Sequence, residues 1–119
     1  MKDSLDNVVF YQMSLTLWDA CWKDTNILIN DVRGKEIAKQ MIRSVGSISA
    51  NISEGYGRGF GKEYPHFLRI ARGSARESKG WYQKSKFLLN VSIIEERIIV
   101  LDKIIYMLNK TINTLMSRK

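Results

Sequence analysis

The stretch SANISEGYGRGFGKEYPHFL, residues 49–68, contains four of the chain's eight glycines, at every second position from Gly55 to Gly61. Glycine-rich segments can hold phosphate groups through their backbone amides, and a site of that kind would indicate a nucleotide-dependent enzyme. They can also reverse the chain between two helices, because glycine adopts backbone conformations that other residues avoid. Which of the two applies decides both the fold and the class of function.

The glycine spacing matches neither common phosphate-binding motif. A dinucleotide fingerprint requires a third glycine where Phe60 or Lys62 stands, and a P-loop requires Ser or Thr in place of Glu63. No strand signal precedes the stretch, as either motif would need. The sequence therefore predicts a turn between two helices. The alternative is a mobile basic loop that contacts RNA or protein through Tyr56, Arg58 and Lys62.

Apolar residues on both sides of this turn recur at the spacing of an α-helix. The helix before the turn carries an apolar row of Ile37, Met41, Val45, Ile48 and Ile52. The helix after it runs from Glu63 to about Asn90, with Pro65 in the first turn, where no helical hydrogen bond is lost. Its inward row is expected to be Tyr64, Phe67, Ala71, Ser74, Ser78, Trp81, Ser85 and Leu88.

Two further helices complete the chain. The last is expected from about Ile93 to about Ser117, with Ser92 and Glu95 as a capping box at its start. Its apolar row is Ile94, Ile98, Leu101, Ile105, Leu108, Ile112 and Leu115. The first begins near Asp6, turns Val9, Met13, Leu17 and Ala20 inward, and is followed by a loop over residues 24–34. The sequence thus predicts one all-α domain, residues 1–119, folded as an up-down-up-down four-helix bundle.

Composition limits the class of protein further. The chain has 119 residues, of which 45% are hydrophobic and 26% are charged, as is usual for a globular domain. The single cysteine excludes an internal disulfide, and the pattern contains neither a signal peptide nor a membrane span, so we expect a cytoplasmic protein without a membrane partner. The formal net charge of +7 favours an acidic partner such as nucleic acid.

The positive charge is concentrated after the glycine turn. Between Lys62 and Lys86 there are seven basic and two acidic residues, which account for +5 of the net charge of +7. Most of these basic side chains fall within an arc of about 120° on a helical wheel, an arrangement suited to a phosphate backbone. The predicted nucleic-acid-binding residues are Arg58, Lys62, Arg69, Arg72, Arg76, Lys79 and Lys86. The alternative is an ordinary solvated face.

Residues for catalysis are few. His66 is the only histidine and Cys21 the only cysteine, so neither a zinc cluster nor a catalytic triad can be assembled. We therefore expect no catalytic residues, no metal, no cofactor and no enzymatic activity. Several carboxylates near the turn could do acid–base work, but a structural polar corner is the preferred interpretation. That corner comprises Arg43, Asn51, Glu54, Glu63 and Glu77.

The last helix carries more apolar surface than one bundle needs. A second apolar row widens its apolar arc to about 180°, whereas a single core uses about 100°. Exposure of this additional apolar surface to water would be unfavourable. The pattern therefore predicts that copies of the chain contact one another through it. The predicted interface comprises Trp18, Trp22, Ile93, Val100, Ile104 and Met107. This pattern indicates only that the protein is not a monomer.

Two blocks that flank the turn, RSVGSISANISEGYGR (residues 43–58) and KEYPHFLRIARGSARES (residues 62–78), resemble a family signature. The family is that of four-helix-bundle proteins related to 23S rRNA intervening-sequence proteins. The matching residues are Arg43, Ser47, Ile48, Asn51, Ile52, Glu54, Gly55, Gly57, Arg58, Lys62, Glu63, Phe67, Leu68, Ile70, Ala71, Gly73, Ser74 and Glu77. The resemblance implies a protomer that assembles into a ring, typically a homopentamer.

The resemblance also bears on function. Related proteins include the accessory variability determinant of diversity-generating retroelements, which works with a reverse transcriptase and its template RNA. The leading hypothesis is therefore a non-enzymatic RNA-binding accessory protein that serves such a reverse transcriptase or rRNA. The alternative is a scaffold ring that recruits an acidic protein partner without binding RNA.

Overall fold

The computed structural model of the chain describes residues 3–59 and 61–118. These residues form four α-helices preceded by one short 3-10 helix, and they include no strand. The elements are η1 (Ser4–Asn7), α1 (Val9–Leu28), α2 (Val32–Gly57), α3 (Glu63–Lys84) and α4 (Val91–Ser117). The prediction of an all-α fold with four helices is confirmed.

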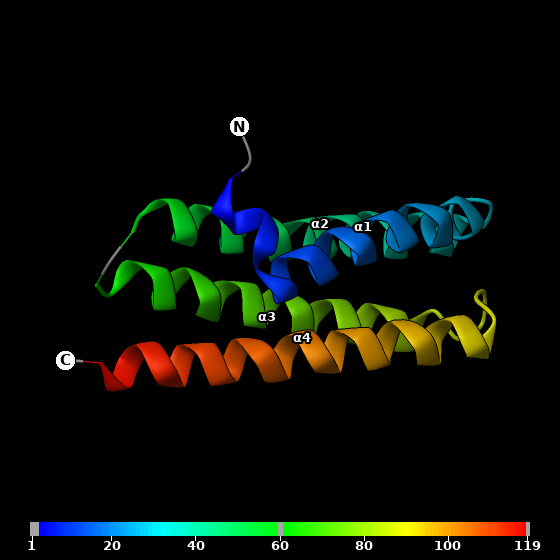
Figure 1. Cartoon of the computed structure of the whole chain (residues 1–119). Coiled ribbons are helices and arrows are strands. Elements are labelled where there is room, and N and C mark those ends of the chain that lie inside the picture. Colours follow the sequence, from blue (N-terminus) through cyan, green and yellow to red (C-terminus); the bar gives the residue numbers. More distant parts are fainter. Residues whose placement is uncertain (1–2, 60, 119) are drawn as a thin grey trace.

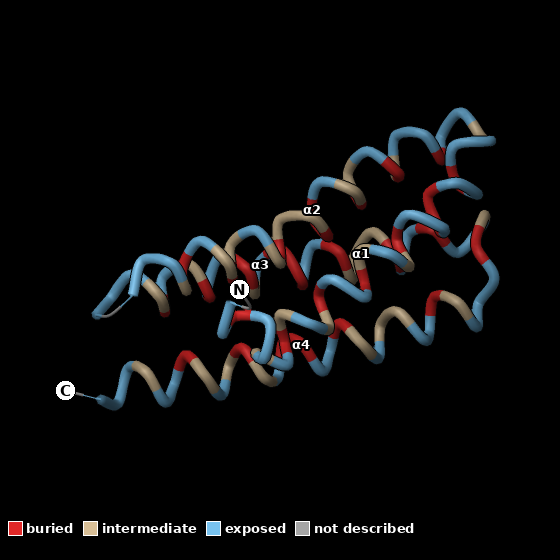
Figure 2. The backbone as a smooth tube through the Cα atoms, turned by 45° about the horizontal axis from the view of Figure 1, so that its top comes forward, coloured by how far each residue is buried: buried red, intermediate tan, exposed pale blue. Residues whose placement is uncertain are grey.

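The four helices run alternately in opposite directions along the molecule (Figure 1). Each packs on its neighbours in the chain, α1 also packs on α4, and the most extensive contact is between α2 and α3. All four helices contain buried residues (red in Figure 2), and the buried hydrophobic residues form one core cluster. The largest fully buried side chains include Tyr82, Leu28, Met41, Ile48, Leu68 and Leu101.

The helix starts differ from the sequence prediction. The start of α4 is capped by Asn90, whose side-chain oxygen accepts a hydrogen bond from the Ser92 amide at 2.9 Å, so Ser92 is not the cap. At the N-terminus, Asp3 rather than Asp6 provides the cap, and it caps η1 instead of α1. Asn and Asp fill such positions because their short side chains reach the free amides of the first turn.

The inward face of α1 was predicted correctly at Leu17, Met13 and Ala20 but incorrectly at Val9, and the end of the helix was predicted incorrectly. Val9 is 51% exposed, while Phe10 is buried beside Leu17 and Cys21. The helix continues through Leu28, into the segment that was expected to be a loop. Residue Asp31 then caps α2 by accepting hydrogen bonds from the amides of residues 33 and 34, so the connection between α1 and α2 is short.

The glycine stretch divides into two parts with different roles. Gly59 and Gly61 have φ of +84° and +85°, which other residues rarely adopt, and here the predicted chain reversal is confirmed. Gly55 and Gly57 instead lie within α2. A Cβ on Gly55 would lie 2.7 Å from the Cβ of Phe67, so this glycine lets α2 and α3 approach closely.

Candidate nucleic-acid interface

Two arginines of α3, Arg69 and Arg76, lie on the surface as the sequence predicted. Both are exposed, and neither forms an ion pair within residues 3–59 and 61–118. They are seven residues apart, which places them two turns of helix, or about 10.5 Å, apart on the same face. Their guanidinium groups remain available to an anionic partner.

Two other cations of the predicted arc face α4 instead. Arg72 donates a hydrogen bond from Nη1 to Oδ1 of Asn109 at 2.8 Å, and Nζ of Lys79 lies 2.8 Å from Oδ1 of Asp102. The side chains of Arg72 and Lys79 are half-buried. No acidic residue of α3 lies in this arc, but Asp102 of α4 faces it. The charge of Lys79 is therefore largely offset.

The remaining predicted contacts occupy the two ends of α3. Lys62 is exposed directly before the helix begins. Lys86 lies beyond the end of α3, because the helix stops at Lys84 rather than near Asn90, and its ammonium group lies 5.2 Å from the ring centre of Phe87.

Arg58 contacts acidic residues of the predicted polar corner, unlike the exposed cations Arg69 and Arg76, which form the basic face of α3 together with Lys62. Its Nε lies 3.5 Å from Glu54 and its Nη1 lies 3.6 Å from Glu63, so it links the end of α2 to the start of α3. Its guanidinium carbon is also 5.4 Å from the ring centre of Phe67. All three charged side chains are about half exposed, and such ion pairs contribute little stability in water.

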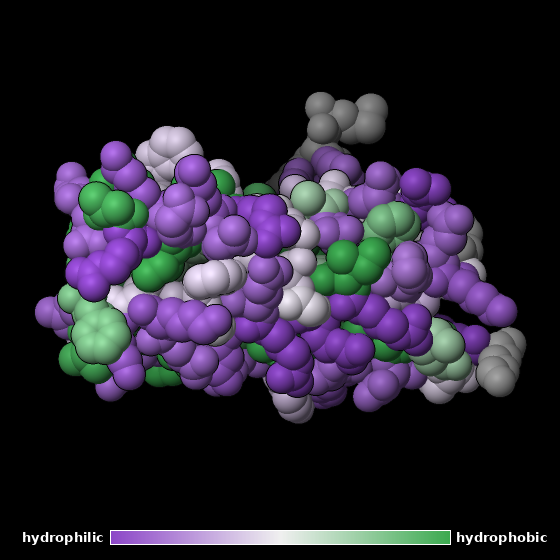
Figure 3. Space-filling view, turned by 180° about the vertical axis from the view of Figure 1, so that it is seen from behind, coloured by the Kyte–Doolittle hydropathy of each residue, from purple (hydrophilic) through white to green (hydrophobic). Residues whose placement is uncertain are grey.

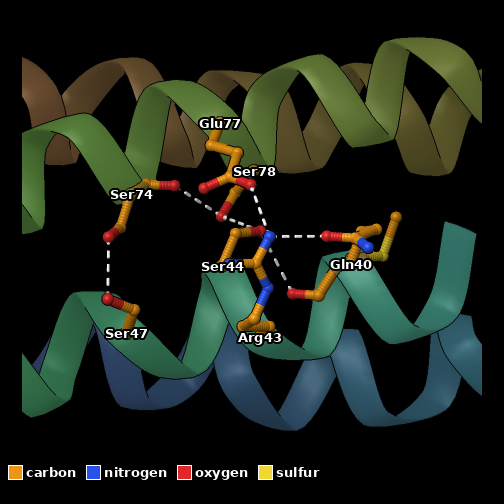
Figure 4. A network of polar contacts seen from close by, with 8 residues as sticks. Gln40, Arg43, Ser44, Ser47, Ser74, Glu77 and Ser78 are labelled. Atoms are coloured by element: carbon orange, nitrogen blue, oxygen red, sulfur yellow. Dashed lines mark hydrogen bonds and ion pairs between the residues drawn. The ribbon is translucent and has the colours of Figure 1, made fainter.

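Arg43 and Glu77 of the predicted corner meet where α2 packs against α3 (Figure 4). Nη2 of Arg43 lies 3.2 Å from a carboxylate oxygen of Glu77, and it donates a 2.6 Å hydrogen bond to Gln40. Asn51 donates to the backbone and side-chain oxygens of Ser47, not to a glutamate. The predicted single corner is therefore two separate clusters.

Serine pairs join the two helices between these clusters. The hydroxyls of Ser47 and Ser74 are 2.8 Å apart, and Ser78 donates to Ser44 at 2.9 Å. Small hydroxyl side chains let the helix backbones come close while each buried polar group keeps a partner. This explains why serine recurs in the inward row of α3.

Seen from behind, relative to the view in Figure 1, the surface of the molecule is mostly hydrophilic (Figure 3).

The predicted interface between copies needs one correction. Ile104 is fully buried in the protomer core and cannot contact a neighbour. Its burial follows from the position of α4, which packs against both α3 and α1 and therefore buries a wider arc than expected. Trp22 is 59% exposed, whereas Trp18 is half-buried and lies against Gly46. The other three predicted residues, Ile93, Val100 and Met107, are half-buried.

A shallow groove lies between α1 and α4 beside these residues. It has a volume of about 500 Å³ and is lined by Met13, Ile99, Asp102, Lys103, Tyr106 and Met107. Ile99 is 55% exposed and Tyr106 61% exposed. Sequence reasoning missed both, because they lie outside the two apolar rows of the last helix.

Sequence reasoning also missed a larger cavity at the end of the bundle that contains the glycine turn. Its volume is about 800 Å³, and it is lined by Tyr56, Gly59, Gly61, Lys62, Tyr64, Leu115, Met116 and Arg118. The cavity combines side chains from the end of α2, the start of α3 and the end of α4. No local sequence pattern indicates that these segments meet.

A buried charged cluster lies near the opposite end. The carboxylate of Asp24, which is 2% exposed, accepts hydrogen bonds from Tyr82 at 2.6 Å and from Arg97 at 2.8 and 3.2 Å. Burial, followed by the hydrogen bond to Asp24, raises the pKa of the Tyr82 phenol. The sequence placed Asp24 in a loop and gave no signal for this cluster.

Neither Cys21 nor His66, the two residues considered for catalysis, has the surroundings of a catalytic group. Cys21 is buried in the core, and burial, with the nearby Asp24 charge, raises the pKa of its thiol to about 12. His66 is exposed and its ring packs edge-on against Phe67, with 5.4 Å between ring centres. In the part of the chain that the structure describes, no three His, Cys, Asp or Glu side chains could together hold a metal ion.

Comparison with known proteins identifies the family. The sequence profile of the 23S rRNA-intervening sequence protein family matches residues 6–114. The chain belongs to this family. The predicted resemblance is thereby confirmed.

One solved structure supports the fold of this 23S rRNA-intervening sequence family protein. It is a protein of unknown function from the S23 ribosomal protein family of Bacteroides thetaiotaomicron VPI-5482. The two structures superpose with a TM-score of 0.79 at 23% identity, and the match covers 87% of this chain and 97% of the other. No curated protein matches the chain. Of the helices described here, none is long and apolar enough to cross a membrane.

Proposed function

We propose that this protein is a non-enzymatic RNA-binding accessory protein whose basic α3 face contacts phosphates. The observation that supports this most is the pair Arg69 and Arg76, which are exposed and have no ion-pair partner among the described residues. Lys62 extends the same face to the glycine turn. Phosphate contacts of this kind position RNA without selecting its sequence, so binding should depend strongly on salt.

We further propose that the protein forms a homo-oligomer, and a ring of five on the basis of the family resemblance. The exposed apolar side chains Trp22, Ile99 and Tyr106 on α1 and α4 favour contact with a second copy. A ring would repeat the basic face around the assembly and strengthen binding to a long RNA. Cytoplasmic rRNA or a reverse transcriptase with its template RNA is the proposed setting.

A scaffold that recruits an acidic protein is the second candidate. The basic face of α3 would suit an acidic protein as well as RNA. Arginine forms paired hydrogen bonds with carboxylate as well as with phosphate, so RNA is favoured because the family is that of 23S rRNA-intervening sequence proteins.

The test of RNA binding is a filter-binding titration over a range of salt concentrations with a structured RNA. Replacing Arg69 and Arg76 with Glu should weaken binding at least tenfold and lower the salt slope by about 1.5. The control carries Lys23→Glu and Lys35→Glu, which change net charge equally at exposed positions near the other end of the bundle. Equal losses in both double variants would contradict the proposed interface.

The test of assembly is native light scattering of the wild type and two variants. Wild type should scatter as an oligomer of the 13.8 kDa chain. Ile99→Lys with Tyr106→Lys should dissociate it without loss of helical circular dichroism. Val32→Lys, at a position 83% exposed at the start of α2, is the control and should leave assembly unchanged. A wild-type particle of 13.8 kDa would refute oligomerisation.

A further inference from the structure

The cavity beside the glycine turn exists because α1 is shorter than the helices around it. α1 and the preceding η1 begin part-way along the bundle, while the ends of α2 and α4 and the start of α3 extend further (Figure 1). Where a complete bundle would place a fourth helix, three helix ends surround the cavity of about 800 Å³. Ligand pockets in proteins commonly have volumes of this order.

The walls of the cavity are aromatic and aliphatic. The rings of Tyr56 and Tyr64 pack edge to face with 5.9 Å between their centres, and Leu115 and Met116 of α4 add aliphatic side chains to the lining. The Tyr56 hydroxyl is hydrogen-bonded to the Ser4 hydroxyl, which fixes its ring from outside the cavity. Burial, with Tyr56 nearby, raises the pKa of Tyr64. A tyrosine phenol is protonated at neutral pH and can donate a hydrogen bond.

The charged residues of the cavity are all positive. Lys62 and Arg118 are exposed members of the lining, and no Asp or Glu is among the lining residues within 3–59 and 61–118. An occupant should therefore combine a flat apolar group with an anion. A nucleotide has both: its base can stack on tyrosine rings, and its phosphate can pair with the two cations.

The contact between α3 and α4 runs toward the end of the bundle that contains this cavity. Lys79 faces Asp102 and, seven residues along each antiparallel helix, Arg72 faces Asn109. A further seven residues bring Pro65 level with Met116, which is part of the lining. Lys62, Arg69 and Arg76 recur every seven residues on the exposed face of α3, so a strand held along them would end at Lys62, which is part of the lining.

We propose that the cavity holds one unpaired nucleotide of a bound RNA, with its base between Tyr64 and Met116 and its phosphate at Lys62 and Arg118. This inference rests on the proposed RNA-binding function. It adds a preference that phosphate contacts alone would not produce: a hairpin with an unpaired nucleotide at the end of its stem should bind more tightly than the same hairpin without it.

The experiment uses two RNA hairpins that differ only in one unpaired 2-aminopurine nucleotide at the end of the stem. Met116→Glu places a carboxylate in the cavity at a position 44% exposed, so the fold should survive the change. This variant should lose about tenfold in affinity for the hairpin with the unpaired nucleotide and show no quenching of its fluorescence. Asn113→Glu, the control, adds the same charge at an exposed position of α4 outside the lining.

The outcomes separate this inference from the proposed function. If Arg69→Glu with Arg76→Glu weakens both hairpins while Met116→Glu and Asn113→Glu behave alike, RNA binding stands and the cavity inference is overturned. If neither hairpin binds, 2-aminopurine ribonucleoside monophosphate is titrated alone. Quenching that Met116→Glu abolishes would support a nucleotide site without RNA binding, and no quenching would overturn both proposals.

Discussion

The two ends of the bundle are built differently. At one end, the turns between α1 and α2 and between α3 and α4 close over a buried network in which Asp24 contacts Tyr82 and Arg97. At the other end, α1 is absent and three helices surround an open cavity with cations at its edge. At the first end, hydrogen-bonded polar groups join three helices. At the second end, the apolar side chains that line the cavity remain accessible to a ligand.

This difference indicates how stability and binding are divided within a small domain. A buried carboxylate held by a guanidinium and a phenol fixes the relative positions of three helices, because a shift of any one helix would break a buried hydrogen bond. The stability of the closed end allows the other end to keep exposed apolar surface. We therefore expect substitutions at the closed end to change stability and those at the open end to change binding.

The largest expected effect is at the closed end. Asp24→Asn removes the charge that pairs with the mostly buried Arg97, and breaking a buried pair of this kind should lower the free energy of unfolding by about 3 kcal/mol. Urea unfolding followed by circular dichroism measures the loss. Glu96→Gln, which removes the exposed second partner of Arg97, is the control and should change stability by less than about 0.5 kcal/mol. A small effect of Asp24→Asn would mean that the closed end is not held by this network.

A smaller loss is expected where α2 and α3 approach near the open end. In Gly55→Ala the new methyl group would lie 2.7 Å from the Phe67 Cβ, and overpacking of this kind costs about 1–3 kcal/mol. The midpoint of urea unfolding should fall accordingly. An unchanged midpoint would show that the two helices can separate at this end without loss.

The buried thiol beside the closed-end network predicts a pH dependence. Because the pKa of Cys21 is raised from about 9 to about 12 on folding, its contribution to stability is complete below about pH 9 and is lost as pH rises toward 12. Above pH 9, this group alone should lower the free energy of unfolding by up to about 1.4 kcal/mol per pH unit. Tyr82 acts in the same direction. Unfolding measured between pH 7 and 10.5 should therefore show a shallower decline in Cys21→Ala than in wild type.

The smallest expected effect is a gain in stability. Gly73 lies inside α3 with nothing within 4 Å of the position a Cβ would occupy. Gly73→Ala should therefore stabilise the protomer by about 0.5–1 kcal/mol, through reduced chain entropy in the unfolded state. Thermal unfolding measures the gain, and a loss would show that the outward face of α3 is packed against a second copy.

Local sequence pattern was enough to predict the four helices and many of their buried residues. Apolar spacing in Ile37–Ile52 and in the last helix depends only on local geometry, so it gave the correct helices and most of their buried faces. The rejection of a phosphate motif between residues 55 and 63 needed only the motif spacing. The polar helix–helix contact was foreseen in part, since Arg43 does meet Glu77.

The tertiary structure decided which faces meet, and this changed the assignment of several residues. Asp24 and Arg97 are 73 positions apart, so no local pattern connects them. Ile104 is buried because α4 packs on two helices at once, and Lys79 is paired because α4 brings Asp102 to it. The cavity at the open end likewise depends on where α1 begins relative to α2 and α4. Helical periodicity fixes the direction of a side chain around its own helix, whereas its partner depends on the position of every other helix in the bundle.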